Sequence, residues 1–271
     1  MNKLVTFLLL ALVCLGHPPT VRAADTDIHL WLPPIWKTER EKAIKIALAF
    51  SQKSGLKIVP RIANTYPEIM RAFAGEGLEL AYVGSMVQAV IIARKLGTPL
   101  FQVIDGKQFY GGVMVFKKDE SPQSILKSSP NGVAYTLGAT AGEVCAKAAT
   151  GGKAAIGGMV DFKAAADAVN MGMASAAFVK DFWWDDNKIK YPKLDFYRVP
   201  GVSEPKNPDN VVVASKSVPP ELKTKLMVAA FSSPEIFGVE VIVPFDSSFL
   251  EFTLDLMKKG GIDPQTYSWP E

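Results

Sequence analysis

Short β-rich runs alternate with amphipathic helical runs along the first half of the chain. Residues 28–32 (IHLWL) predict a strand, and residues 39–52 predict a helix because their apolar positions recur at helical spacing. The alternation continues with strands predicted at 56–61, 78–83 and 100–104 and helices at 67–74 and 85–95. This order is typical of parallel strands covered by helices.

A second series of elements follows a change in composition. After a strand predicted at 113–116, residues 117–130 are polar and rich in turn formers. The second series has strands predicted at 132–135 and 175–179 and helices at 141–149 and 162–171. A loop rich in Pro and Asn at 200–209 then precedes a strand at 211–214 and helices at 220–231 and 248–259. We therefore expect a second sheet in the middle of the chain.

The first residues have the pattern of an export signal. Lys3 precedes an apolar run, residues 4–15, which has the length of a signal-peptide core and is too short to span a bilayer as a helix. Val21 and Ala23 supply the small residues that signal peptidase requires, so we expect cleavage after Ala23. Val13 precedes Cys14 where a lipoprotein signal needs a small residue, which argues against a lipid anchor.

Charge and cysteine content narrow the classes of function. Loss of Lys3 and Arg22 with the signal reduces the basic residues from 30 to 28, against 27 acidic ones. This balance argues against nucleic-acid binding. Cys14 also leaves with the signal, so Cys145 would have no partner for an internal disulfide.

The sequence carries little that suggests catalysis. His29 is the only histidine left after cleavage, and it falls inside a predicted strand with no GxSxG, HExxH or CxxC motif in the chain. The adjacent Asp185 and Asp186 fit a solvated turn, and residues 151–153 (GGK) lack the rest of a phosphate-binding loop. We expect a protein that is not an enzyme and that needs no cofactor or metal.

Several turns resemble those of the periplasmic phosphate, phosphite and phosphonate binding proteins. The similarity is carried by residues 30–34, Thr65, Tyr66, Glu68, 80–85, 109–111, 139–142, Ala168, Val169 and Gly172. It implies an α/β type II periplasmic binding protein with two lobes, each a mixed sheet flanked by helices, joined by two hinge strands. Lobe 1 would comprise residues 24–115 and 211–271 and lobe 2 residues 116–210, with crossings near Phe116 and Val211 and the ligand in the cleft.

The chain departs from that family where the anion would bind. The family's Ser-Thr-Ser-Gly turn is replaced by ATAG at 139–142, Phe162 stands at a position that is commonly His, and Ser175 at one that is Asp. Hydrogen bonds to a charged group are worth roughly 1.5 to 3 kcal/mol each. Losing three of them would weaken phosphonate binding by about three to six decades.

Aromatic and apolar residues stand near the expected cleft instead: Trp31, Met86, Phe162, Phe178, Phe182, Trp183 and Trp184. Such residues are more often core than site. Tyr66 and Tyr110 match family ligand positions, whereas Ser85 also fits a plain helix cap and Cys145 a small buried helix residue. The resulting set of predicted ligand-binding residues is Tyr66, Ser85, Tyr110, Thr140, Gly142, Phe162, Ser175, Phe178 and Trp183.

Three functions remain open at this point. The main interpretation is a monomeric periplasmic solute-binding protein that delivers an apolar or amphipathic, lipid- or sterol-like ligand to an inner-membrane or envelope transporter. The alternative is a phosphate, phosphite or phosphonate receptor of an ABC transporter, with backbone N–H groups of residues 140–143 binding the anion. The third is a sensory partner that reports its ligand to a membrane kinase.

Overall fold

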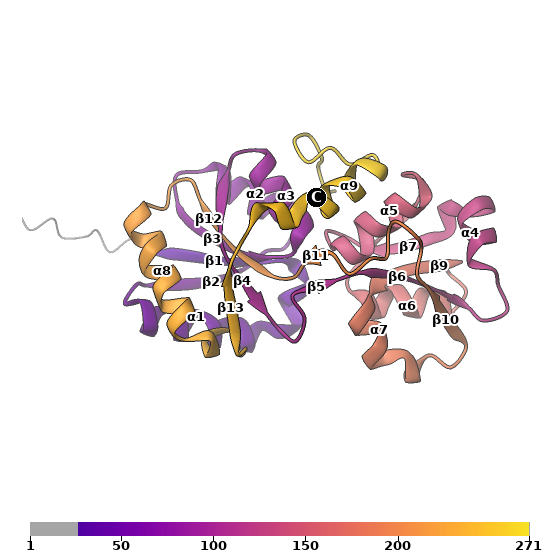
Figure 1. The fold of residues 1–271 in the computed structure, drawn as a ribbon, viewed down its shortest axis with the longest axis horizontal. Helices are drawn as coiled ribbons and strands as arrows, with labels where there is room; N and C mark the ends of the chain where they lie inside the picture. The colour runs from indigo at the N-terminus through magenta and orange to yellow at the C-terminus, as the bar shows by residue number, and fades with distance from the viewer. Residues whose placement is uncertain (1–26, 271) are drawn as a thin grey trace, which may run out of the picture.

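The computed structural model describes residues 27–270, and the predicted export signal lies outside them. Two sheets form two lobes that lie side by side along the long axis of the molecule (Figure 1). No helix within residues 27–270 combines the length and the apolar character needed to cross a membrane.

The first lobe is built on a six-stranded sheet in the order β13-β4-β12-β3-β1-β2. Its strands are β1 (Ile28–Leu32), β2 (Ile58–Ile62), β3 (Leu78–Val83), β4 (Gly97–Ile104), β12 (Val211–Ser215) and β13 (Val241–Pro244). β1 pairs in parallel with β2 and β3, whereas β12 is antiparallel to both β3 and β4. Helices α1 (Arg40–Ser54) and α8 (Pro220–Ser232) pack on one face through a shared core, and α2 (Tyr66–Ala74) and α3 (Ser85–Ala93) pack on the other.

The second lobe is built on a five-stranded sheet in the order β10-β6-β9-β7-β8. Its strands are β6 (Gly112–Lys117), β7 (Val133–Thr136), β8 (Ile156–Met159), β9 (Ala176–Lys180) and β10 (Leu194–Tyr197). Helices α6 (Phe162–Asn170) and α7 (Asp181–Asn187) cover one face. A turn of π-helix, η3 (Thr140–Val144), runs directly into α5 (Cys145–Thr150) on the other face, where α4 (Pro122–Ser128) also packs.

A pair of two-residue strands links the lobes. β5 (Phe109–Tyr110) pairs antiparallel with β11 (Asn207–Pro208), between the two sheets (Figure 1). The crossing that we expected near Phe116 falls inside β6, in the second sheet. Gly111 and Gly112 mark the passage between β5 and β6, but the polar stretch after the run suggested a boundary several residues later.

The elements with clear periodicity have the predicted types, and those without it were missed. β8 (IGGM) carries two glycines, which weaken any strand pattern, and α7 (DFWWDDN) has no amphipathic repeat. α4 lies inside the stretch that composition alone marked as turns. β10 and β13 are four-residue strands at the edges of their sheets, too short to show an alternation.

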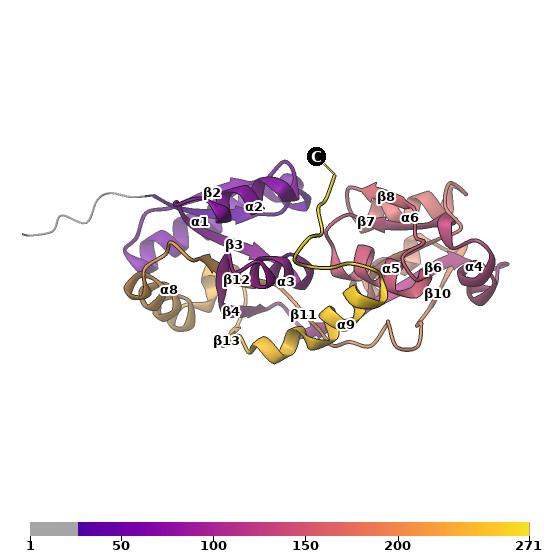
Figure 2. The same cartoon turned by 90° about the horizontal axis from the view of Figure 1, so that it is seen from above.

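The segment after α9 (Glu251–Lys259), which we name the C-terminal strap (residues 260–270), runs between the two lobes (Figure 2). Arg94, at the end of α3, donates from Nε to the carbonyl of Pro264 at 3.2 Å and from Nη2 to the carbonyl of Tyr267. Further along, the Trp269 ring lies 5.1 Å from the Tyr66 ring of the first lobe, and its indole N–H donates to Glu143 of the second lobe. The strap therefore contacts both lobes.

Candidate ligand site between the lobes

A cavity of about 160 Å³ lies between the lobes. Its lining comes from both: Pro33, Ile35, Trp36, Tyr66, Gly84, Val87, Tyr110, Asp209 and Asn210 on one side, and Gly138, Ala139, Thr140, Ala141, Phe162 and Lys180 on the other. Gly84 directly precedes α3, and Ala139 directly precedes η3. Two helix N-termini therefore face the cavity, one from each lobe, and each presents N–H groups that lack an acceptor within its own helix.

Three buried hydroxyl groups join the lobes beside the cavity. Ser85 Oγ lies 2.9 Å from Thr140 Oγ1 and 3.3 Å from Tyr110 Oη. The backbone N–H of Met86 donates to Thr140 Oγ1 at 2.8 Å, so a side chain of the second lobe caps a helix of the first. Burial, with a smaller contribution from the Asp209 carboxylate, raises the pKa of Tyr110, which keeps this phenol protonated and able to donate.

An ion pair forms one wall of the cavity. Lys180 Nζ, at the end of β9, lies 2.8 Å from each carboxylate oxygen of Asp209, at the hinge. Only 15% of the Lys180 side chain and 5% of that of Asp209 are exposed. The ammonium group also lies 4.5 Å from the ring centre of Tyr110 and 4.0 Å from that of Phe182. Lys180 is thus a largely desolvated cation held beside the cavity.

Tyr66 of the first lobe packs closely against the second lobe at Gly138. Its ring packs against the Trp269 ring, 5.1 Å away, and against the backbone of Gly138. Gly138 has a φ of +71°, and a Cβ added there would lie 2.1 Å from Tyr66 Cζ. Only glycine fits both the backbone conformation and the space.

Glu143 supplies a buried carboxylate within the second lobe. Its Oε2 accepts from the backbone N–H of Gly138 at 2.7 Å and from the indole N–H of Trp269 at 3.2 Å. Its Oε1 accepts from Lys147 Nζ at 2.7 Å and from the Tyr267 hydroxyl. The backbone N–H of Glu143 itself donates to the carbonyl of Ala139 at 2.7 Å. Both N–H groups are thereby used within the protein, and of residues 140–142 only Thr140 and Ala141 line the cavity.

The structure brings part of the predicted site together. Tyr66, Tyr110, Thr140 and Phe162 line the cavity, and Ser85 bonds to two of them beside it.

The other predicted residues lie elsewhere. Gly142 packs against the backbone of Thr136, Phe178 is fully buried in the core, and Trp183 packs behind Phe162. Ser175 precedes β9 at the end opposite Lys180, where its side chain lies against Gly132. These four residues do not line the cavity.

Sequence reasoning missed Trp36, Lys180 and Asp209. Ligands of open α/β sheets bind outside the carboxyl ends of the strands. Lys180 ends β9 and Ser175 precedes it, so this rule favours the lysine. Asp209 lay in a segment that the sequence marked only as a loop.

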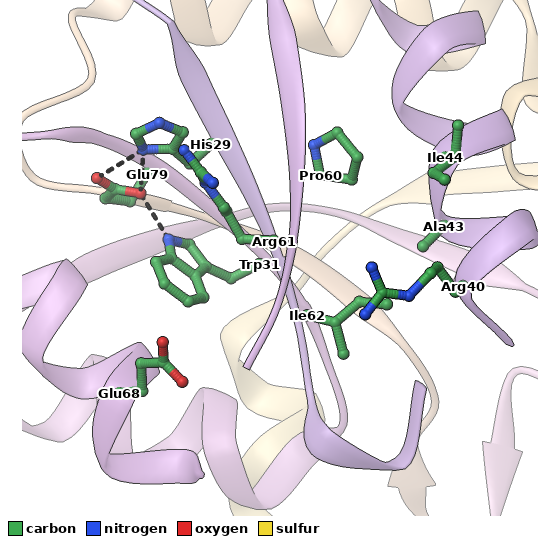
Figure 3. Close-up of a pocket in the computed structure, with 10 residues that line it drawn as sticks. All are labelled: His29, Trp31, Arg40, Ala43, Ile44, Pro60, Arg61, Ile62, Glu68 and Glu79. Atoms are coloured by element: carbon green, nitrogen blue, oxygen red, sulfur yellow. Dashed lines mark hydrogen bonds and ion pairs between the residues drawn. The ribbon is translucent and has the colours of Figure 1, made fainter. Parts of the chain in front are cut away.

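A wider depression of about 690 Å³ lies on the first lobe alone. Figure 3 shows that its residues lie on both sides of the edge strand β2, with Arg61 directed to one side and Pro60 and Ile62 to the other. Glu79 accepts from Trp31 Nε1 at 2.6 Å and lies 3.3 Å from His29 Nδ1. Because these polar groups bond to one another, the interlobe cavity is the better candidate. Within residues 27–270 no group of three or more His, Cys, Asp or Glu side chains could hold a metal ion.

Several solved structures share this architecture. PhnD1 from Prochlorococcus marinus (MIT 9301), in complex with methylphosphonate, is 14% identical over 87% of this chain and 98% of its own, with a TM-score of 0.66. A binding protein component of an ABC phosphonate transporter (PA3383) from Pseudomonas aeruginosa is 15% identical over 86% and 87%, with a TM-score of 0.67. XAC2383 from Xanthomonas citri, bound to ATP, is 12% identical over 87% and 97%, also with a TM-score of 0.67.

At these identities the comparisons establish the fold alone, and the predicted two-lobed α/β fold is confirmed. No protein-family model matches the chain. No curated protein matches it either.

Proposed function

We propose that this protein is a periplasmic solute-binding protein that closes its lobes around the anionic group of a small solute and delivers the solute to an ABC transporter. The observation that carries the proposal is the convergence of two helix N-termini and Lys180 on one interlobe cavity. A helix N-terminus favours an anion through its partial positive charge and its N–H groups. The largely desolvated ammonium group of Lys180, which is paired with Asp209, adds a charged donor at the same place.

The size of the cavity favours the oxyanion alternative over a lipid or sterol. A volume of about 160 Å³ equals that of roughly five water molecules in the liquid. A phosphate, phosphite or phosphonate group fits such a volume, whereas pockets for larger organic ligands span about 300 to 1,000 Å³. The methylphosphonate complex of a protein with this fold agrees with this choice of ligand.

The chemistry of the cavity also supports binding rather than catalysis. Burial raises the pKa values of Tyr66 and Tyr110, so neither phenol ionises readily to act as a base. Lys180 is paired with Asp209. These groups can hold an anion by hydrogen bonds and charge without transferring a proton to it.

Two substitutions at the ion pair test the proposal by the sign of their effects. Phosphate, phosphite and methylphosphonate would be titrated calorimetrically into the wild type, Lys180→Gln and Asp209→Asn. We expect Lys180→Gln to lower the affinity for the anion by roughly 10- to 150-fold, which corresponds to the loss of one hydrogen bond to a charged group. Asp209→Asn should strengthen binding, because it removes a negative charge that competes for Lys180.

Circular dichroism would first establish that both variants are folded. If none of the three anions binds to the wild type while a lipid or sterol does, the proposal is wrong and the apolar-ligand interpretation replaces it.

A further inference from the structure

A second compartment of about 440 Å³ adjoins the interlobe cavity at Ile35 and Tyr66. Both lobes and the C-terminal strap contribute to its lining: Pro34, Ile35, Lys37, Thr38, Asn64, Thr65, Tyr66, Leu137, Gly158, Met159, Val160, Asp161 and Pro270. We name it the outer compartment and the 160 Å³ cavity the inner cavity. Nothing in the proposed binding of a small anion uses the outer compartment.

The two compartments are neighbours whose linings meet along several segments of the chain. Ile35 and Tyr66 line both of them. In the second lobe, Leu137 and Asp161 line the outer compartment. The residues that follow them, Gly138 and Phe162, line the inner cavity. Tyr66 therefore borders both compartments, and the outer compartment is the neighbouring space available to the rest of a solute whose anionic group lies in the inner cavity.

The outer compartment is suited to a hydrocarbon group. Ile35, Leu137, Met159 and Val160 supply aliphatic and thioether side chains from both lobes. Val160 is 74% exposed, so its apolar surface is unpartnered in the described chain. Covering such surface with a hydrocarbon removes apolar area from water on both sides of the contact.

We propose that the outer compartment binds an apolar arm of the solute, so that the ligand is an amphipathic anion with a small oxyanion head and a hydrocarbon tail. This inference rests on the proposed function, because the head must occupy the inner cavity. It accounts with a single molecule for the smaller cavity, which Lys180 and two helix N-termini border, and for the larger compartment next to it.

A series of alkylphosphonates with methyl, butyl and octyl groups tests the inference by calorimetry on the wild-type protein. Each methylene that enters the outer compartment should tighten binding by about fourfold, the transfer value of one CH₂ group. Octanol, which has a similar arm without the anionic head, should bind much more weakly than octylphosphonate.

Substitutions of two exposed valines test whether the alkyl arm gains its affinity in the outer compartment. Val160→Asp places a charge in the outer compartment and should lower the ratio of octylphosphonate to methylphosphonate affinity by at least tenfold. Val228→Asp changes a 58% exposed valine on α8, remote from both compartments, and should leave this ratio unchanged.

The outcomes separate this inference from the proposed function. If methylphosphonate binds and longer arms add nothing, the outer compartment does not bind ligand, and the proposed function survives. If no phosphonate of any length binds, both proposals are overturned. Equal binding of octanol and octylphosphonate would refute the requirement for an anionic head.

Discussion

Substitution of Gly138 by alanine should hinder closure of the lobes without unfolding either of them. The added Cβ would lie 2.1 Å from Cζ and 2.2 Å from Cε2 of Tyr66, far inside van der Waals contact. The Trp269 ring, 5.1 Å from that of Tyr66, restricts the movement of Tyr66 away from the added methyl group. The lobes of the Gly138→Ala protein should therefore stop short of the separation seen here.

Gly138→Ala has a backbone cost and a steric cost, and only the steric cost lowers the affinity for ligand. Alanine at a φ of +71° costs about 1 kcal/mol or more, but this cost lies within the second lobe and is paid whether the lobes are open or closed. The steric cost arises only on closure, and overpacking typically costs about 1 to 3 kcal/mol. Apparent affinity for a ligand that requires the closed form should therefore fall roughly 5- to 150-fold.

Gly151→Ala is the matched control. Gly151 also has a positive φ, +59°, but a Cβ added there meets no atom within 4 Å. Both variants should lose similar stability in urea unfolding, whereas only Gly138→Ala should lose methylphosphonate affinity by calorimetry and compactness by small-angle scattering. If the two variants bind equally well and give the same scattering curve, contact between Tyr66 and Gly138 does not limit closure.

Three further predictions concern motion, the cysteine and the strap. Saturating ligand should reduce the radius of gyration measured by small-angle scattering, because closure rotates the lobes about β5 and β11; an unchanged curve would refute a hinge. Burial raises the pKa of the Cys145 thiol to about 12, so a disulfide reagent at pH 8 should label it only after unfolding; rapid labelling of the native protein would contradict this. Trp269→Phe removes one donor from the buried Glu143 carboxylate and should cost about 1 to 3 kcal/mol in urea unfolding, so an unchanged midpoint would show that the bond contributes nothing.

The sequence predicts the lobes better than it predicts the site. Periodicity identified β1, β3 and α3 because their apolar residues are buried against helices or strands of the same lobe. Tyr66, Tyr110 and Thr140 were identified because a resemblance in the turns marked them. The pair of Lys180 and Asp209 was missed because residues 29 apart in sequence meet only through the geometry of the hinge. No local sequence pattern predicts a contact of this kind.

The interpretation of an apolar ligand shows the same limit. Phe178 and Trp183 were assigned to the cleft from their position in the sequence, but they are used in the packing of the second lobe. Phe162 does line the inner cavity, yet so does Lys180, which sequence reasoning had left out. Which apolar and which charged side chains line the cavity is therefore decided by the tertiary structure and not by local sequence.

The C-terminal strap has a consequence for how the protein folds. Its contacts join residues very far apart in sequence: Trp269 lies 126 positions from Glu143, and Tyr267 lies 173 positions from Arg94. Contacts that close such long loops carry a large entropic cost and form slowly, whereas each lobe can gain stability from nearer contacts first. Refolding should therefore produce two native-like lobes before the strap docks, and indole fluorescence from Trp269 should report this late step. A chain caught between these steps would have its secondary structure complete and its binding site still unassembled.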